Sequence, residues 1–440
     1  MKVSSFVAGA MLFVTRAASA DEPPRTNTPP PLAWADFSWL PGNYASSESP
    51  LAAGPFTGEL RMDMAYHHEL TNAPKDDTIS GSSEVFRHGE LQVTHIGVGG
   101  NFEWKGVEAR LMTQFGMYSQ TTPRNDASPA RGQWNLADAY RYVSEAYGGY
   151  HFDVMRGIHV QAGIFMSYVG LWSYYNFDNW TYQPSYVSSN TPWFFDGVRI
   201  QIFPSDKLKI EPWLVNGWQS YGKFNQAPGL GVQIAWRPLS WLAFVGNQYL
   251  GTDTLATPDR KRVHTDDSVM VKLWDRPQAA LDKLAVSLTV DAGCEEGGGV
   301  TCTSQYFLGF MAYARAWFAK NRIGLTVGGG AIENPGRYLV LIPPIHGATA
   351  FSGTPYFTAN PGDPFRAWDL QITADVMPTP FVTFRAEYNH RAASVSYFAG
   401  SGGVTPDGGN QGDPGSVVPG WAPDLVSYEN RLTLAMMVKY

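Results

Sequence analysis

The 440-residue chain is short of charged residues, of cysteine and of long hydrophobic runs. Charged residues make up 16% of it, against about 25% in an average soluble domain, whereas aromatic residues reach 14%. No stretch beyond the N-terminus approaches the roughly 18 apolar residues of a membrane-spanning helix. The net charge of −7 argues against a nucleic-acid partner. Few charges, many aromatic residues and abundant glycine favour amphipathic strands.

Motifs of the common enzyme classes are also missing. The sequence contains no Gly-x-Ser-x-Gly elbow, no His-Glu-x-x-His pair and no Walker A loop. His67 and His68, like Asn389 and His390, occupy adjacent strand positions, so their side chains point to opposite faces and cannot act on one atom. We therefore expect that the protein is not an enzyme and needs no cofactor.

The two cysteines, Cys294 and Cys302, stand on either side of a short glycine-rich stretch. In an oxidising compartment such a pair favours one local disulfide that closes a loop tip. A metal site there would need further ligands nearby, and the sequence offers none. No metal is expected.

The N-terminus has the pattern of a secretory signal. Lys2 precedes a short apolar core, and Ala18-Ser19-Ala20 is typical of a cleavage site. The sequence therefore predicts a signal peptide over residues 1–20. Residues 21–57 are rich in proline and predict an extended periplasmic lead-in. The remaining residues, 58–440, carry the strand pattern.

The last strand of the chain alternates apolar and smaller or polar residues and ends on Tyr440. Leu432, Leu434, Met436 and Val438 share one face with Tyr440. Outer-membrane barrels close with such a strand, whose aromatic end lies at the membrane interface. The barrel-assembly machinery recognises this kind of end and is an expected partner during biogenesis.

Strands alternate with short and long connections, which is the pattern of a bacterial outer-membrane barrel. We count sixteen candidate strands, within about 14 to 18, because boundaries from sequence are uncertain. The fold class is therefore all-β, a transmembrane antiparallel barrel with both termini in the periplasm and an aqueous lumen. The candidate strands are 58–70, 90–104, 106–120, 139–153, 157–167, 194–203, 207–218, 229–237, 241–251, 267–274, 281–293, 304–318, 322–332, 366–377, 381–391 and 425–440.

One face of each strand should meet lipid and the other should line the lumen. A charge that faces lipid near the midplane costs about 2–4 kcal/mol for Arg or Lys, so the charged faces are assigned to the lumen. Both signs are present, which in a porin constriction can orient a passing solute. A polar lining that merely hydrates and braces the wall is the alternative. The pore-lining candidates are Glu108, Arg110, Glu145, Arg199, Glu211, Arg315, Asp369, Asp375, Arg385, Glu387, Arg391 and Arg431.

Two groups of aromatic residues stand out. Those beside the short turns, among them Trp104, Phe203, Trp236 and Trp317, predict a girdle at the periplasmic interface. The third long connection is also unusually aromatic. It predicts either an inward-folding constriction that could stack on sugars, or an outer girdle that packs on itself. Its candidates are Trp172, Tyr174, Tyr175, Trp180 and Trp193.

Four short motifs carry a resemblance to a known family. They are Asn179-Trp180-Thr181-Tyr182, Gly197-Val198-Arg199, Pro204-Ser205-Asp206-Lys207-Leu208 and Val215-Asn216-Gly217-Trp218. Together they resemble the OmpL-like group of β-barrel porins, also called BBP2, over about residues 139–251. The resemblance implies an outer-membrane barrel and a channel, and it implies no particular solute.

These observations lead to one main hypothesis with alternatives. The main hypothesis is an outer-membrane porin for passive diffusion of small hydrophilic solutes, and a saccharide-selective channel is a special case of it. The alternatives are a surface adhesin or receptor that acts through the long outer loops, and a soluble periplasmic β protein. The expected partners are the lipid bilayer and the solutes. By analogy with porins of this size, we also expect a homotrimer.

Overall fold

The computed structural model describes residues 30–42, 51–338, 345–348, 352–354, 356 and 362–440. The expected signal peptide and the start of the lead-in lie outside these residues. Among the described residues, no helix is long and apolar enough to cross a membrane.

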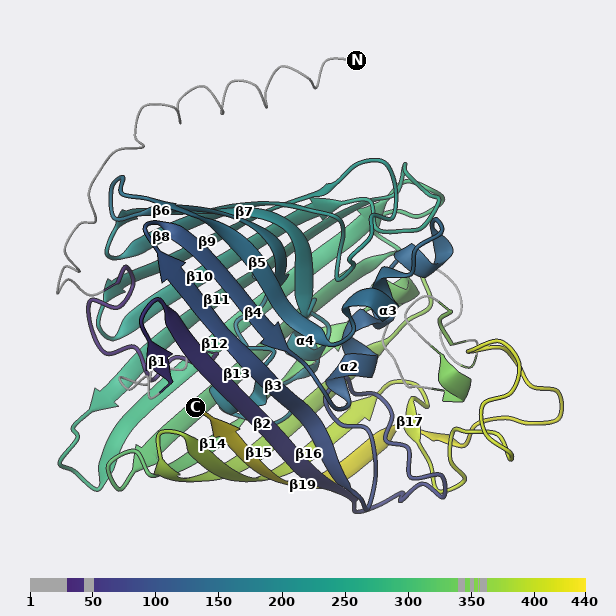
Figure 1. Cartoon of the computed structure of the whole chain (residues 1–440). Coiled ribbons are helices and arrows are strands. Elements are labelled where there is room, and N and C mark those ends of the chain that lie inside the picture. The colour runs from purple at the N-terminus through teal and green to yellow at the C-terminus, as the bar shows by residue number, and fades with distance from the viewer. Residues whose placement is uncertain (1–29, 43–50, 339–344, 349–351, 355, 357–361) are drawn as a thin grey trace. The chain divides into compact units, whose positions relative to one another are not determined.

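Sixteen antiparallel strands form one closed barrel (Figure 1). Each strand pairs with its neighbours in the chain, and β19 pairs with β2 from Arg431 opposite Glu69 to Lys439 opposite Arg61. This closure confirms the predicted strand number and leaves no free sheet edge. The barrel strands are β2 (Phe56–Glu69), β3 (Leu91–Trp104), β4 (Val107–Thr113), β5 (Val143–Phe152), β6 (Ile158–Met166), β7 (Phe194–Ser205), β8 (Leu208–Val215), β9 (Gly229–Leu239), β10 (Leu242–Gly251), β11 (Lys261–Asp275), β12 (Leu281–Glu296), β13 (Tyr306–Phe318), β14 (Ile323–Glu333), β15 (Arg366–Thr379), β16 (Val382–Ala393) and β19 (Tyr428–Lys439).

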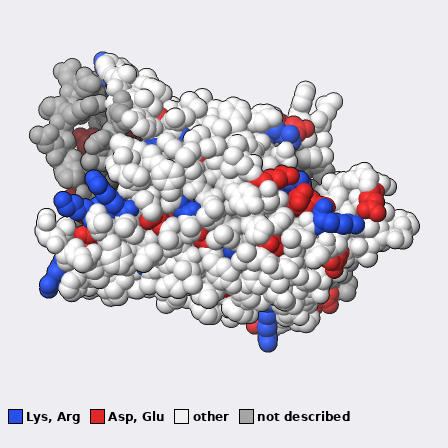
Figure 2. Space-filling view, turned by 90° about the horizontal axis from the view of Figure 1, so that it is seen from below, with Lys and Arg blue, Asp and Glu red and all other residues white. Residues whose placement is uncertain are grey.

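Alternation along each strand separates an apolar outside from a polar inside. On β15, Leu370 and Ile372 are exposed, whereas Gln371 and Thr373, which alternate with them, are fully buried. Most of the barrel flank in Figure 2 is free of charged side chains, and the larger charged groups lie toward the two ends. An outer face of this kind suits lipid, and polar side chains that would be costly there are turned inward.

The two ends of the barrel differ. Short turns gather at one end and the long connections at the other, together with the helices α2 (Tyr118–Thr121) and α3 (Leu136–Tyr140) (Figure 1). The short-turn end faces the periplasm in bacterial barrels. Three minor strands lie outside the barrel count: β1 (Ala52–Ala53), β17 (Phe398–Ala399) and β18 (Leu425–Val426).

Two predicted strand boundaries differ from the observed ones by more than four residues. The strand expected over 106–120 ends at Thr113, because the chain turns at Gly116, which has a φ of +94°. A side chain at Gly116 would begin only 2.6 Å from the carbonyl oxygen of Val93, so that turn requires glycine. Strand β11 begins at Lys261, six residues before the expected start, because its outer end continues to pair with β12.

The expected periplasmic girdle is only partly observed. Trp104 and Trp236 are exposed on the outside, as expected. Phe203 and Trp317 are 8% and 7% exposed and face the interior, where Phe203 contacts His159 and Trp317 contacts Trp180. Whether an aromatic side chain faces lipid or the interior depends on its odd or even position along the strand and not on its distance from a turn.

The disulfide between Cys294 and Cys302 is present. Cys294 lies on β12, and Cys302 lies in the connection that leads to β13. The bridge therefore closes the tip of this hairpin.

Candidate functional site

The third long connection enters the barrel. We call residues 167–193 the inserted segment, which includes the short helix α4 (Tyr186–Ser189). It leaves the barrel wall at β6 and reaches β15 and β16. There the backbone nitrogens of Tyr182 and Gln183 donate to Glu387, at 2.5 and 2.9 Å. The structure thus answers the question left open by the sequence, because this aromatic connection lies inside the barrel.

Arginine side chains of the barrel wall hold the backbone of the inserted segment. Arg385 donates to the carbonyl oxygens of Thr181 and Asn179, both at 2.7 Å. The same guanidinium forms a paired contact with Asp375 at 2.7 and 3.0 Å. Arg315 also contacts Asp375, at 2.7 Å. These charges are buried, and buried ions are tolerated only when partners and hydrogen bonds replace water.

Further pore-lining candidates on the same wall also contact the inserted segment. Asp369 accepts hydrogen bonds from the Ser185 hydroxyl at 3.0 Å and from the Tyr186 backbone at 2.8 Å. Arg391 donates to the carbonyl oxygen of Pro184 at 2.8 Å. Arg431 pairs with Glu429 and donates to Gln183. The candidates on β13, β15, β16 and β19 are therefore inward-facing, but they anchor a buried segment.

Three candidates on the opposite wall, Glu108, Arg110 and Glu145 of β4 and β5, keep more contact with solvent, whereas Glu211 on β8 is 1% exposed. Arg110 on β4 bridges Glu59 at 3.0 Å and Glu145 at 2.9 Å, and these three side chains are 10–14% exposed. Arg385 and Asp375 are only 1% and 0% exposed. The open part of the lumen thus borders the wall from β4 to β6.

Arg199 and Glu211 belong to this wall and contact aromatic rings. The Arg199 guanidinium lies 4.4 Å from the centre of the Phe165 ring and 4.9 Å from that of Tyr147. Glu211 accepts a hydrogen bond from the Trp213 indole at 3.0 Å. Glu108, on β4, binds His159 at 2.7 Å. All the pore-lining candidates therefore face inward, and the two walls use them differently.

A second segment, residues 31–42, occupies the short-turn end of the interior. Trp39 is 1% exposed, and Asp36 pairs with Lys283 of β12 at 2.9 Å. The backbone nitrogen of Gly42 donates to the carbonyl oxygen of Asp178 at 2.9 Å, which joins this segment to the inserted one. The proline content suggested only an extended lead-in. The apolar residues Trp34, Phe37, Trp39 and Leu40 were the sequence signal for a packed segment.

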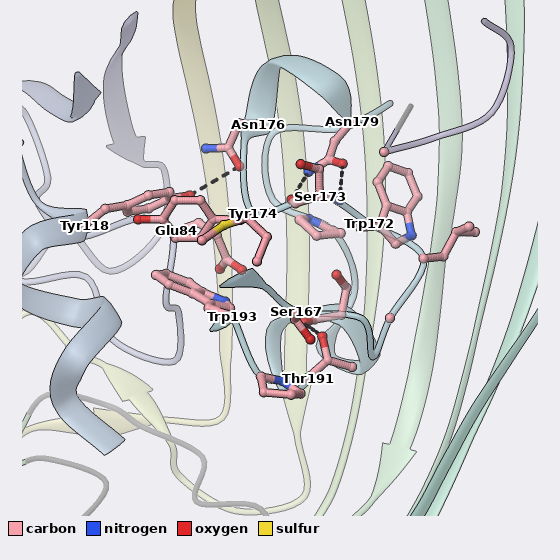
Figure 3. A pocket seen from close by; sticks show the side chains of 17 residues that line it. Glu84, Tyr118, Ser167, Trp172, Ser173, Tyr174, Asn176, Asn179, Thr191 and Trp193 are labelled. Atoms are coloured by element: carbon pink, nitrogen blue, oxygen red, sulfur yellow. Dashed lines mark hydrogen bonds between the residues drawn. The ribbon is translucent and has the colours of Figure 1, made fainter. Parts of the chain in front are cut away.

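A cavity of about 270 Å³ lies beside the inserted segment (Figure 3). Its rim includes the predicted rings of Trp172, Tyr174 and Trp193 and also Tyr118, which the sequence did not single out. Tyr118 packs 4.7 Å from Tyr174 and 4.8 Å from Trp193, measured between ring centres. Polar side chains complete the lining: Glu84, Ser167, Ser173, Asn176, Asn179, Ser188 and Thr191.

The other two predicted rings lie elsewhere in the interior. Tyr175 is covered by the Arg61 guanidinium at 3.7 Å and donates to Glu145 at 2.9 Å. Trp180 packs edge-on against Trp317, with ring centres 5.7 Å apart. The five rings therefore do not form one continuous row.

A cavity of about 430 Å³ opens at the short-turn end and is rich in cationic side chains. Its acidic members are Asp178 and Asp375, and Trp39 forms part of its wall. The cationic members outnumber the acidic ones among the residues that line this cavity. The cationic members are Lys283, Arg315, Lys320, Arg322 and Arg385.

Comparison with protein families agrees with this geometry. Residues 56–413 match the family described as "Putative beta-barrel porin-2, OmpL-like". The chain belongs to this porin family. Family membership and the closed barrel locate the protein in the bacterial outer membrane. No curated protein sequence matches the chain.

Solved structures share the fold at low sequence identity. OprB of Pseudomonas putida is 10% identical, with a TM-score of 0.52 over 88% of this chain and 94% of OprB. The anion-selective porin of Comamonas acidovorans is 9% identical, with a TM-score of 0.48 over 88% of this chain and 99% of its own. The outer membrane channel DcaP of Acinetobacter baumannii is 10% identical, with a TM-score of 0.47 over 88% and 99%. The likeness to OprB supports a common barrel fold and nothing finer.

Proposed function

We propose that the protein is an outer-membrane channel through which small hydrophilic solutes diffuse passively. The observation that carries this proposal is the unequal exposure of the two interior walls. Charged side chains from β13 to β19 are buried under the inserted segment, whereas Arg110, Glu108 and His159 on β4 and β6 are 10–20% exposed. The solute path is the part of the lumen along β4–β6.

The ionic network around Arg110 is the proposed constriction. Arg110 lies between Glu59 and Glu145, and Lys439 approaches Glu59 at 3.9 Å. Basic and acidic groups that face one narrow passage orient dipolar solutes and bias ion flow. A polar passage of this kind excludes apolar solutes, because they cannot replace the water that hydrates these charges.

Reconstitution in a planar bilayer tests this proposal. Stepwise conductance supports a channel, and the reversal potential in a salt gradient reports which sign of charge dominates the path. Silent insertion of correctly folded protein would contradict the proposal and favour the surface adhesin or receptor. The homotrimer and the contact with the assembly machinery stay predictions.

The cavity in Figure 3 favours saccharides as one solute class. Its lining combines four large rings with hydroxyl and amide groups, which is the chemistry that binds a sugar's apolar face and its hydroxyls. The indole N–H of Trp172 borders this cavity and has no hydrogen-bond acceptor among the described residues. A sugar hydroxyl is a suitable acceptor for it.

Sugar block of the ion current tests this second candidate. Replacing Trp172 and Trp193 by Ala should weaken the block if these rings contact the sugar. Trp236→Ala is a matched control, because Trp236 is 45% exposed on the outside of the barrel. Unchanged block in the interior variants would remove saccharide binding from the account.

A further inference from the structure

Three strands at the short-turn end bring two histidines and a carboxylate together on the interior face. They are Glu108 on β4, His151 on β5 and His159 on β6, and one ligand atom from each lies within 4.8 Å of the others. His151 and His159 face each other as direct partners across the β5–β6 ladder. The sequence did not predict this cluster, because its members come from separate strands and form no local motif.

The separation of the imidazole nitrogens matches a metal site. Nδ1 of His151 and Nε2 of His159 lie 3.3 Å apart. Two nitrogen ligands at about 2.0–2.1 Å from a tetrahedral zinc ion lie about 3.3 Å apart, by simple geometry. The two nitrogens therefore have the spacing of two ligands of one ion.

Glu108 sets the tautomer of His159. Its Oε1 lies 2.7 Å from Nδ1 of His159, and its Oε2 accepts a hydrogen bond from Gln161 at 2.8 Å. An ionised carboxylate only accepts, so the proton of His159 sits on Nδ1 and the lone pair of Nε2 points toward His151. A histidine that donates its other nitrogen to a carboxylate is the usual arrangement of a metal ligand.

Gly157 leaves space beside both nitrogens. A side chain at this position would begin 3.2 Å from Nε2 of His159 and 3.5 Å from Nδ1 of His151. Its φ of +123° also suits glycine alone. The carboxylates of Glu103 and Asp153 interact electrostatically with His151 and add negative charge around the site.

We propose that His151 and His159 bind a divalent zinc-type cation, and that Glu108 orients His159 for it. Imidazole ligands select zinc, copper and nickel over magnesium and calcium, which prefer oxygen. The site faces the lumen at its periplasmic end, where a cation can reach it from solution. The proposal does not depend on conduction through the barrel.

Titration of zinc into the folded full-length barrel in detergent tests the proposal, with calorimetry as the readout. We expect one zinc ion per chain in the parent protein. His159→Asn should lower the zinc affinity at least tenfold, because one of the two ligands is lost. Glu108→Gln should lower it about 10- to 100-fold, as for other groups that orient a metal ligand. Cobalt absorption gives a second readout of imidazole coordination.

His68→Asn is the control variant. The ring centres of His68 and His88 lie 5.0 Å apart at the outer end of the barrel, so this substitution removes a histidine from a different pair. Equal zinc affinity in the parent and His159→Asn overturns the proposal, as does a loss of affinity in His68→Asn alone. If His159→Asn does not fold, as judged by heat-modifiable migration on a gel, His151→Gln makes the same test.

Discussion

The carboxylate of Glu387 on β16 accepts a hydrogen bond from the backbone nitrogen of Gln183 at 2.9 Å, across the interior of the barrel. The two residues are 204 positions apart in the chain. Glu387 also accepts from the backbone of Tyr182 and from the hydroxyl of Thr373. Glu387 thus helps to hold the inserted segment against the β15–β16 wall.

Glu387→Gln should loosen this attachment. The charged acceptor is lost, and hydrogen bonds to charged groups contribute about 1.5–3 kcal/mol each. We expect a larger and noisier single-channel conductance, measured in planar bilayers. Glu333→Gln is the control, because Glu333 pairs with Arg366, which is 73% exposed, and such surface pairs contribute little. Equal conductance in the parent and Glu387→Gln would argue against this anchoring role.

Arg110→Gln should make the channel more selective for cations. Removal of the Arg110 guanidinium leaves Glu59 and Glu145 without their shared cationic partner on the solvent-accessible wall. The reversal potential in a salt gradient measures this change. Glu145→Gln should shift the potential in the opposite direction. If both variants keep the parent's reversal potential, the constriction lies elsewhere.

Trp39→Ala should open the short-turn end. Trp39 is 1% exposed, and truncation of a buried Trp costs about 3–5 kcal/mol in a packed core. We expect residues 31–42 to become sensitive to added protease, as measured by proteolysis of the folded barrel. Trp241→Ala, on the exposed outside, should leave the digestion pattern unchanged.

The contact between Asp36 and Lys283 should persist over most of the pH range. Burial acts to raise the pKa of Asp36, but hydrogen bonds from Ser38 and Lys283 outweigh it and lower the pKa from 3.8 to about 2. A lowered folded-state pKa stabilises the docked segment above pH 3.8, and this contribution is lost as the pH falls toward 2. Protease sensitivity of residues 31–42 should therefore stay constant from pH 4 upward. Asp36→Asn should increase it from pH 4 upward, and equal sensitivity of both proteins in this range would contradict this role.

Replacing Cys294 and Cys302 by Ser should lower stability without altering the pore. The bridge closes a short loop at the tip of one hairpin, so its loss should cost about 2–3 kcal/mol. The β12–β13 ladder remains paired along its length. Urea unfolding should shift to lower concentration, while the conductance stays that of the parent. A changed conductance would show that this loop tip reaches the solute path.

The strand pattern was readable from the sequence because it is local. Leu434 is exposed and Thr433 is fully buried, as their alternation on the terminal strand predicted. Strand count, closure and inward direction of the charged side chains follow from this two-residue period and from the cost of placing charge in lipid. The partners of those charges did not follow from it. Arg385 meets the carbonyl oxygens of Thr181 and Asn179, which are more than 200 residues away in the chain.

The sequence by itself determined the class of fold, the membrane, the apolar outside and the charged inside. These properties depend on side-chain periodicity, which is the same wherever the strand lies in the barrel. Only the tertiary structure decided what fills the lumen, because a long connection can fold inward or outward with the same composition. It also decided that His151, His159 and Glu108 meet, since strand register places His151 opposite His159 and Glu108 opposite Gly149, two residues from His151. The filled lumen and the His151–His159–Glu108 cluster have the same physical reason. Backbone pairing and closure of the barrel bring together side chains that are far apart in the sequence.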